Sequence, residues 1–437
     1  MNIENDNNSE TRRSFIKTSL LGSLFLSTGL FTWSCDSSED EKKEIVKASV
    51  AAQSLETDDD WLKIRNLFNL KNDRTFLNTA SIGPTYHSVE EQIISTMRLL
   101  NSKITTGHSM VGSVRSKIAK FLNADTTEVA ITRNSTEGMN IIAQNLSLKK
   151  GDEIILSSHE HIGGAAPWLA LKEQLGFTIK VIDISNKNGD VLKTLKDAFT
   201  PRTKALSVSH ILCTTGEILP VKQIVNLCKE YNIISCIDGA QALGMIPTDL
   251  ADIDPDFYTT CGHKWLFGPE GSGILYVNKN RLPSCKSHYM GAYSDSEFNL
   301  QKQKMVLVKS ASRMEYGTRN TPLIIGLGEA VDVATTIGVE KIAKRGKELA
   351  DYFLEKISSI KNIKIITPLS ENAYCSIITI KIKGKDNLNI SKQLNDKALF
   401  IRGIYENDLN ALRVSFSIYN TKNEINLLIK ELKEKVL

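Results

Sequence analysis

The fold and the chemistry of this chain are decided by Gly262–Pro269, with the sequence GHKWLFGP. Before it, the apolar segment Phe257–Thr260 predicts a strand, and after a glycine-rich turn Ile274–Val277 predicts another. Lys264, beside a histidine at the end of a strand, is well placed to form a Schiff base where a crowded or cationic site favours its deprotonated amine. Taken alone, the same pattern also fits a surface lysine.

Apolar segments alternate with helical patterns such as Val221–Tyr231 through most of the chain. The predicted strands are Val129–Thr132, Glu153–Leu156, Ile179–Asp183, Ala205–Ser209, Ile233–Ile237, Phe257–Thr260 and Ile274–Val277. Strands separated by helices predict an α/β fold with a largely parallel, doubly wound sheet. Ligands of such sheets bind outside the carboxyl ends of the strands.

A smaller α/β unit is predicted after Thr321-Pro322. It begins with a helical stretch, Leu323–Ile357, continues with strands at Ile363–Ile366 and Ser376–Ile382, and ends in a helix with a capping box at Thr421–Glu424. The predicted bounds are 58–80 for an N-terminal segment that packs with the small domain, 81–322 for the large domain and 323–437 for the small domain.

The first 35 residues are typical of an export signal. The basic segment Arg12–Lys17 resembles a twin-arginine motif, and an apolar run from Thr18 to Trp33 follows it. Cys35, directly after Ser34, fits a lipoprotein cleavage site loosely, and residues 36–57 are predicted to be a linker. We expect an exported protein, either periplasmic or held at a membrane by a lipid on Cys35; a cytoplasmic protein is the alternative.

Composition excludes several classes of function. A net charge of +4 over 437 residues gives no indication of nucleic-acid binding. The seven cysteines show no CxxC pair and no Cys/His ligand spacing, so we predict no metal site. Their odd number, without a regular framework, argues against a disulfide scaffold.

Polar residues follow two of the predicted strands. Ser135 and Thr136 open an amphipathic helix after Val129–Thr132, where hydroxyls and backbone amides suit a phosphate; a plain helix cap is the alternative. His161 lies past Glu153–Leu156, where an imidazole is suited to stack on an aromatic cofactor, and an ordinary loop histidine is the alternative.

Three further positions are suited to ligand contacts. Asp238 ends a very apolar strand, and a carboxylate there suits a pyridinium nitrogen, with Gln241 facing the same pocket; otherwise Asp238 caps a helix. Thr318 lies in a Gly-Thr turn that suits a phosphate or simply joins two domains. Arg413 sits in an apolar strand and needs an anionic partner, either a substrate carboxylate or a structural Asp or Glu.

The order and spacing of these groups, from about Phe76 to Tyr419, resembles the class V aminotransferase family of fold-type-I pyridoxal 5'-phosphate enzymes. The motifs Asp238–Gln241 and His263–Trp265 are highly specific when they occur together. The resemblance implies fold type I, with a large domain built on a mostly parallel seven-stranded sheet and a smaller C-terminal α/β domain. It also implies a homodimer with an amino acid as substrate.

The resemblance implies a role for each candidate residue. The catalytic residues are Lys264, which forms the Schiff base and moves the α-proton, His161, which stacks on the ring, and Asp238, which pairs with the pyridine nitrogen. Gln241 would contact the phenolic oxygen, and the phosphate would be held by Ser135, Thr136, His263 and, from a neighbouring subunit, Thr318. The substrate residues are Arg413, which binds the carboxylate, and Asn78, which lines the same pocket.

The motifs around Lys264 and Thr318 are most similar to the isopenicillin N epimerase-like branch of the family. A cysteine desulfurase of this family needs a loop cysteine shortly before the Arg413 strand, and the loop Arg402–Asn410 has none. Two cysteines, Cys213 and Cys261, depart from the family pattern near the cofactor. We therefore expect an aminotransferase or an epimerase. The alternatives are a lyase or desulfurase-like enzyme and an exported binding protein without catalysis.

Overall fold

The computed structural model describes residues 55–71, 73–185, 189–286 and 289–436. By its internal contacts the chain divides into Met1–Lys47 and Ala48–Leu437, and every element below belongs to the second unit. The export signal at 1–35, the lipid on Cys35 and most of the linker lie outside the described residues, so they stay predictions.

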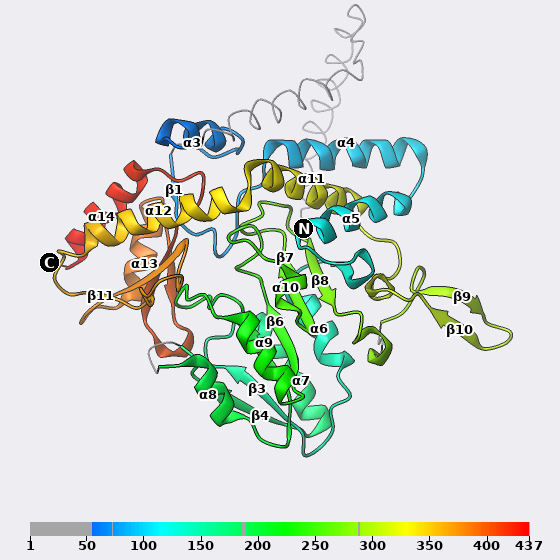
Figure 1. Ribbon diagram of the computed structural model, residues 1–437. Helices are drawn as coiled ribbons and strands as arrows, with labels where there is room; N and C mark the ends of the chain where they lie inside the picture. Colours follow the sequence, from blue (N-terminus) through cyan, green and yellow to red (C-terminus); the bar gives the residue numbers. More distant parts are fainter. Residues whose placement is uncertain (1–54, 72, 186–188, 287–288, 437) are drawn as a thin grey trace, which may run out of the picture. The chain divides into compact units, whose positions relative to one another are not determined.

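A seven-stranded sheet carries the site (Figure 1). Its strands are β2 (Val129–Thr132), β3 (Glu153–Ser157), β4 (Thr178–Ile182), β5 (Thr203–Ser209), β6 (Ile234–Asp238), β7 (Phe257–Cys261) and β8 (Gly273–Val277). They lie in the order β2-β8-β7-β6-β5-β3-β4, and only β8 runs antiparallel to its neighbours, β2 and β7. The mostly parallel seven-stranded sheet is confirmed.

These strands are almost continuously apolar because helices cover both faces of the sheet. Ile131 and Leu206 face one apolar cluster, and their neighbours in sequence, Ala130 and Ala205, face another. The first cluster holds residues of α4 (His87–Lys103), α5 (Val111–Phe121), α8 (Val191–Ala198), α9 (Val221–Glu230) and α11 (Thr321–Ile337). The second holds residues of α6 (Ser135–Asn145) and α7 (Ile162–Leu175).

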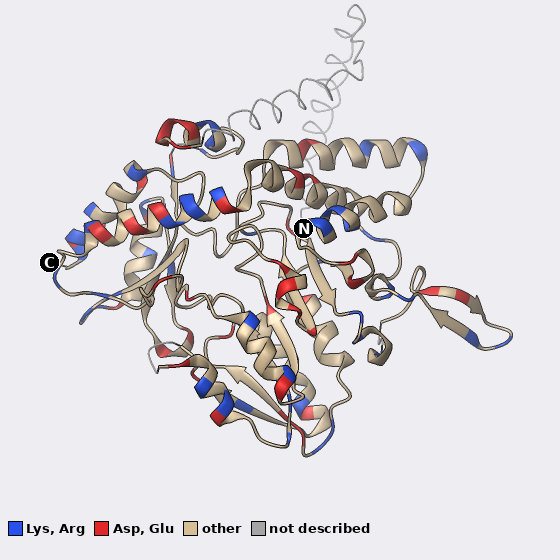
Figure 2. Cartoon of the chain, viewed as in Figure 1, with Lys and Arg blue, Asp and Glu red and all other residues tan. Residues whose placement is uncertain are grey.

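The smaller C-terminal part is α/β, as expected, and its sheet has four antiparallel strands, of which only the first two were predicted with their bounds. Its strands, in spatial order, are β11 (Ile363–Ile365), β12 (Ile377–Ile382), β15 (Ala411–Ser415) and β14 (Arg402–Ile404). Its helices are α12 (Val339–Ile357), α13 (Asn387–Asp396) and α14 (Lys422–Val436). Figure 2 shows basic and acidic residues interspersed along α12 and α14, and the apolar residues of these helices join one cluster with the strands. The predicted capping box is present, because Thr421 and Glu424 each bond the other's backbone N–H.

The prediction of one helix over Leu323–Ile357 was wrong. Gly338 has a φ of +90°, and the chain bends by 75° between α11 and α12 at this residue. Glycine adopts this backbone conformation without the steric cost that a side chain would carry. Across the described residues, no helix is by itself long and apolar enough to cross a membrane, and α11 and α12 pass that test only as a bent pair.

Several short elements were not predicted. The two-residue strands β1 (Thr75–Phe76) and β13 (Leu399–Phe400) pair in parallel, and β9 (Asp295–Asn299) and β10 (Lys304–Leu307) form a hairpin. The remaining α-helices are α3 (Asp58–Arg65) and α10 (Leu250–Ile253). The 3₁₀ helices are η1 (His108–Met110), η2 (Thr126–Glu128), η4 (Leu282–Ser284), η5 (Ala311–Met314) and η6 (Glu406–Asp408).

The segment 75–83 joins the small sheet to the lysine loop. Leu77 donates its N–H to Phe400 O and accepts a bond from Ser415 N, at 2.9 and 2.8 Å. Further along, Gly83 N donates to His263 O at 2.8 Å. The N-terminal segment is thus bonded both to the C-terminal sheet and to the residue before Lys264.

Gly83 packs directly against the backbone of Lys264. A Cβ atom at this position would lie 2.1 Å from Lys264 O and 2.8 Å from the Phe267 ring. We expect Gly83→Ala to lower the free energy of unfolding by about 2–3 kcal/mol, because the added methyl overpacks a rigid contact. Denaturant unfolding measures the change.

Gly112 provides the matched control. It lies in α5, and a Cβ atom there would meet no other atom within 4 Å. Gly112→Ala is expected to raise the free energy of unfolding by about 0.5–1 kcal/mol, because alanine has the higher helix propensity. Equal unfolding midpoints for the two variants would contradict the close packing at Gly83.

Candidate active site

The carboxyl ends of the parallel strands bring the predicted site residues to one edge of the sheet. Ser209, the last residue of β5, lies in register with Asp238, the last residue of β6. A cavity of about 410 Å³ opens at this edge. The predicted residues that line it are Ser135, Thr136, His161, Asp238, Gln241, His263, Lys264 and Arg413.

Asp238 is a buried carboxylate without a cation partner among the described residues. Its Oδ1 accepts a hydrogen bond from Ala240 N at 2.9 Å. Burial raises its pKa, against the opposing effects of that hydrogen bond and of the Lys264 charge. No helix begins at Asp238, since the next described helix is α10, so the capping alternative does not apply. The carboxylate fits a protonated ring nitrogen, which would supply the missing positive charge.

Two neutral imidazoles lie in the same cavity. Burial, and then the positive charge of Lys264, lower the pKa values of His161 and His263 to about 4. His161 Nδ1 accepts a hydrogen bond from Gly163 N at 3.1 Å and so caps α7. His263 Nδ1 is buried and has no hydrogen-bond partner among the residues that the structure describes. A neutral His161 ring suits stacking on an aromatic cofactor, and the unpaired His263 nitrogen suits a polar ligand atom.

The first turn of α6 offers a place for a phosphate. The side chain of Asn134, not that of Ser135 or Thr136, caps this helix by accepting from Glu137 N at 2.8 Å. A helix N-terminus with two hydroxyl residues beside the cavity is suited to an anion. Because Asn134 is the cap, the alternative of a plain serine or threonine cap does not apply.

Gln241 is held in one orientation by two hydrogen bonds. Its Nε2 donates to Ala80 O at 2.9 Å, and its Oε1 accepts from Trp265 Nε1 at 2.8 Å. Because Nε2 carries two N–H groups, one donor is left for a ligand oxygen. Trp265, which follows Lys264, thus fixes the side-chain amide of Gln241 in the Asp238–Gln241 motif.

Arg413 is fully buried and is bonded only to neutral groups in the described structure. Its Nη1 donates to Cys213 O at 2.8 Å, and its Nη2 donates to Ser81 Oγ at 2.9 Å and to Asn78 Oδ1 at 3.4 Å. Burial, reinforced by Arg402, lowers its pKa to about 10, so the guanidinium stays charged at neutral pH. With no described carboxylate paired to it, a substrate carboxylate is its best partner.

Asn78 does not line the cavity as predicted. It lies behind Arg413, to which it is bonded, and Ser81 lines the cavity in its place. The reason is the turn after Asn78, in which Ser81 N donates to Asn78 O at 2.9 Å. Asn78 therefore positions the guanidinium.

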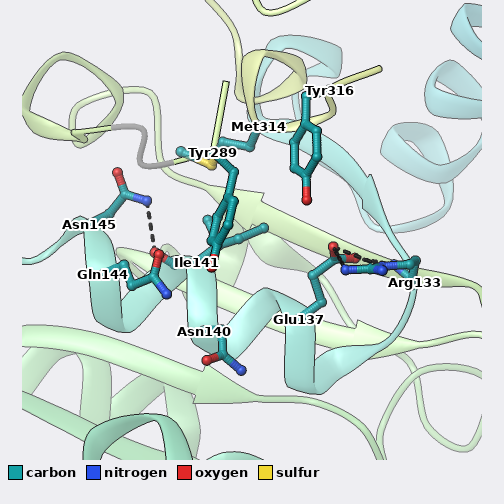
Figure 3. A pocket seen from close by; sticks show the side chains of 9 residues that line it. All are labelled: Arg133, Glu137, Asn140, Ile141, Gln144, Asn145, Tyr289, Met314 and Tyr316. Atoms are coloured by element: carbon teal, nitrogen blue, oxygen red, sulfur yellow. Dashed lines mark hydrogen bonds and ion pairs between the residues drawn. The ribbon is translucent and has the colours of Figure 1, made fainter. Parts of the chain in front are cut away.

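Thr318 lies outside the cavity that holds Lys264. It lines a neighbouring hollow of about 260 Å³ together with Arg133, Glu137 and Tyr316. Those three side chains also line the pocket drawn in Figure 3, where Arg133 pairs with Glu137. The predictions that Thr318 reaches a neighbouring subunit's phosphate and that the protein is a homodimer stay predictions.

The cavity residues that were not predicted as ligand contacts include Arg402 and Cys213. Arg402 lines it, pairs with Glu406, and lies directly opposite Arg413 in the β14–β15 register. Cys213 lines it as well, and burial raises its pKa to about 11. The signal for Arg402 in the sequence is weak, because a charged residue in a three-residue strand also fits a solvated edge.

This chain is similar to a known protein family and to several curated relatives. The family model for aminotransferase class-V matches residues 80–428. A probable cysteine desulfurase of Mycolicibacterium paratuberculosis is 29% identical over 329 residues, which are 72% of this chain and 47% of that protein, so the chain spans about half of that relative. A probable cysteine desulfurase of Methanothermobacter thermautotrophicus is 28% identical over 85% of this chain and 97% of that protein.

Solved structures share the fold. C-DES, a cystine C–S lyase, in complex with its reaction product cysteine persulfide, superposes with a TM-score of 0.77 at 23% identity, over 83% of this chain and 98% of that one. C-DES with glycine covalently linked to its PLP cofactor superposes with a TM-score of 0.79 at 22% identity, over 85% and 99%. The predicted fold type I and the predicted cofactor, pyridoxal 5'-phosphate, are confirmed.

Proposed function

Because the chain belongs to the class V aminotransferase family and is a pyridoxal 5'-phosphate enzyme, we propose that it cleaves the C–S bond of a cysteine-type amino acid. One observation carries the proposal: Lys264, Asp238 and Arg413 line one cavity. An amine, a carboxylate and a buried guanidinium in one place suit an α-amino acid bound to this cofactor. The curated relatives, which are cysteine desulfurases, support sulfur as the leaving atom.

The cysteines of the cavity favour a lyase over a desulfurase that loads sulfur onto its own thiol. The loop Arg402–Asn410 has no cysteine, and among the described cysteines only Cys213 lines the cavity. Since burial raises the pKa of Cys213 to about 11, its thiol is protonated at neutral pH and is a poor nucleophile. A disulfide such as cystine needs no enzyme thiol, because the sulfur leaves as a persulfide of the other half.

When bound, pyridoxal phosphate supplies an electron sink for negative charge at the substrate's α-carbon. Arg413 Nη1 and Nη2 bind the substrate carboxylate and so orient the α-hydrogen. Lys264 Nζ accepts that proton as a general base and can return it to the leaving sulfur. Asp238 would hold the cofactor's ring nitrogen, and Ser135, Thr136 and His263 would hold its phosphate.

Aminotransferase and epimerase are the second candidate. The observation in their favour is the same absence of a cysteine in Arg402–Asn410. They share with the lyase the removal of the α-proton, and they differ in what is lost from the substrate afterwards. The relatives support sulfur chemistry more than either of these two reactions.

Product analysis separates the candidates. Purified holoenzyme given L-cystine is expected to form cysteine persulfide, pyruvate and ammonium in equal amounts, because β-elimination breaks the C–S bond and the remaining enamine hydrolyses. L-Cystathionine, which has a thioether in place of the disulfide, serves as the control substrate. Amino transfer to a keto acid, or exchange of the α-hydrogen with solvent deuterium while sulfur is retained, would instead establish the second candidate.

A further inference from the structure

A second carboxylate, that of Glu160, lies next to Asp238. Glu160 follows β3 and directly precedes His161. Its Oε1 accepts from Ser209 N at 3.0 Å and its Oε2 bonds Ser209 Oγ at 2.8 Å, so the carboxylate is held at the end of β5. The residue is partly buried, and both oxygens of its carboxylate bond to Ser209. None of the roles assigned above uses it.

Gly164 lies close to both carboxylates. A Cβ atom at this position would lie 3.3 Å from Glu160 Oε2 and 3.3 Å from Asp238 Oδ2. Both oxygens therefore border the same small space. Among the described residues neither carboxylate has an ion-pair partner, and two neighbouring carboxylates in such a place do not both ionise readily.

We propose that Glu160 is a positioning residue that holds a proton beside Asp238 at neutral pH, so that Asp238 alone carries the negative charge facing the cofactor's ring nitrogen. When this proton leaves to solvent at higher pH, a second negative charge appears next to Asp238. The added negative charge stabilises the positively charged, protonated groups of the bound cofactor. Glu160 thus makes the electronic state of the cofactor depend on pH.

The direction of titration agrees with this geometry. Burial first, and then Asp238, raise the pKa of Glu160 to about 8, although the two bonds from Ser209 lower it. Other titratable groups act on Asp238 or lie beside it on β5, β7 and the lysine loop. They are Lys264, Cys261 and Tyr258, together with His210, whose pKa burial lowers to about 4 so that it stays neutral.

The experiment compares the visible absorption of the native holoenzyme and of its Glu160→Gln variant from pH 6 to pH 9.5. The amide keeps the shape of the carboxylate and its bonding to Ser209 but does not titrate. We expect the variant's spectrum to match the native one below pH 7, and its yellow band to fade about one pH unit lower, because the stabilising second charge never forms. Cofactor affinity is expected to agree within about twofold at pH 6.5 and to fall below the native value at pH 9.

Two further variants sharpen the test. Ser209→Ala removes one hydrogen bond to the charged form of Glu160, so its spectral transition should shift in the same direction by a smaller amount. Glu153→Gln is the matched control, because Glu153 is a buried carboxylate at the opposite end of β3, bonded to Thr200 and Thr203. Its transition should stay at the native pH.

A merely structural Glu160 would give another result. The Gln variant would then keep the native transition pH, or would differ from the native protein equally at pH 6.5 and pH 9, and either outcome overturns the inference. The inference rests on the cofactor of the proposed function but not on C–S cleavage. A shifted transition in an enzyme that forms no persulfide would therefore refute the function and leave the role of Glu160 standing.

Discussion

Replacement of Lys264 by alanine is expected to abolish the yellow absorption of the holoenzyme and to lower kcat by about 10³-fold or more. Lys264 follows β7 and lines the cavity together with Asp238 and Arg413. On the proposed roles of Lys264, the substitution removes both the amine that bonds the cofactor and the base that takes the α-proton. No other lysine lines this cavity within the described structure. Absorption spectroscopy and steady-state kinetics measure the two losses.

Lys204 is the control for this experiment. It is an exposed residue of β5, in the same sheet but directed away from the site. Lys204→Ala should keep both the absorption and the rate. A Lys264→Ala protein that stays yellow, or that turns over cystine at more than about a tenth of the native rate, would show that another amine does the chemistry.

Replacement of Arg413 by lysine is expected to weaken amino-acid binding by about 10²–10³-fold, because a buried charged hydrogen bond contributes about 3–4 kcal/mol. Lysine keeps the positive charge but not the planar pair of donors. Its shorter reach also frees Cys213 O and Ser81, which the guanidinium now holds. The dissociation constant is measured from the shift of the visible band as L-cystine is added.

Cystamine provides the control ligand, since it is cystine without its carboxylates. The affinity for cystamine should change less than about threefold in Arg413→Lys, because cystamine has no carboxylate that the guanidinium could bind. Equal weakening of cystine and cystamine would mean that Arg413 supports the shape of the cavity and does not bind the substrate carboxylate. An unchanged visible spectrum without ligand would show that the variant still folds and holds its cofactor.

The sequence predicted best those features that local patterns determine. All seven strands of the large sheet were found within two residues of their predicted bounds, because each is an unbroken apolar run bounded by turns. Asp238 and Arg413 were found for a related reason. A charge inside an apolar strand is costly unless a partner compensates it, so the residue type itself signals a ligand.

Contacts between distant segments could not be predicted from such patterns. β1 is only two residues long, and its partner β13 lies over 300 residues further along the chain. Glu160 directly precedes His161, which was predicted, but nothing in the sequence shows that its carboxylate bonds Ser209 and borders Asp238. The break at Gly338 was missed because a single glycine within an apolar helical pattern is often tolerated.

The segment 75–83 crosses the active site and is hydrogen-bonded to both sides of it. It is hydrogen-bonded to β13 and β15 through Leu77, touches Arg413 through Asn78 and Ser81, and reaches the lysine loop through Gly83. Nine consecutive residues thus connect the backbone beside Lys264 with the side chains that hold the guanidinium of Arg413. A β-amino acid carries its carboxylate one carbon further from its amine, so we expect it to bind more weakly than an α-amino acid at these two ends. On the proposed roles of Lys264 and Arg413, a preference for α-amino acids would therefore depend on this strip of backbone as much as on these two side chains.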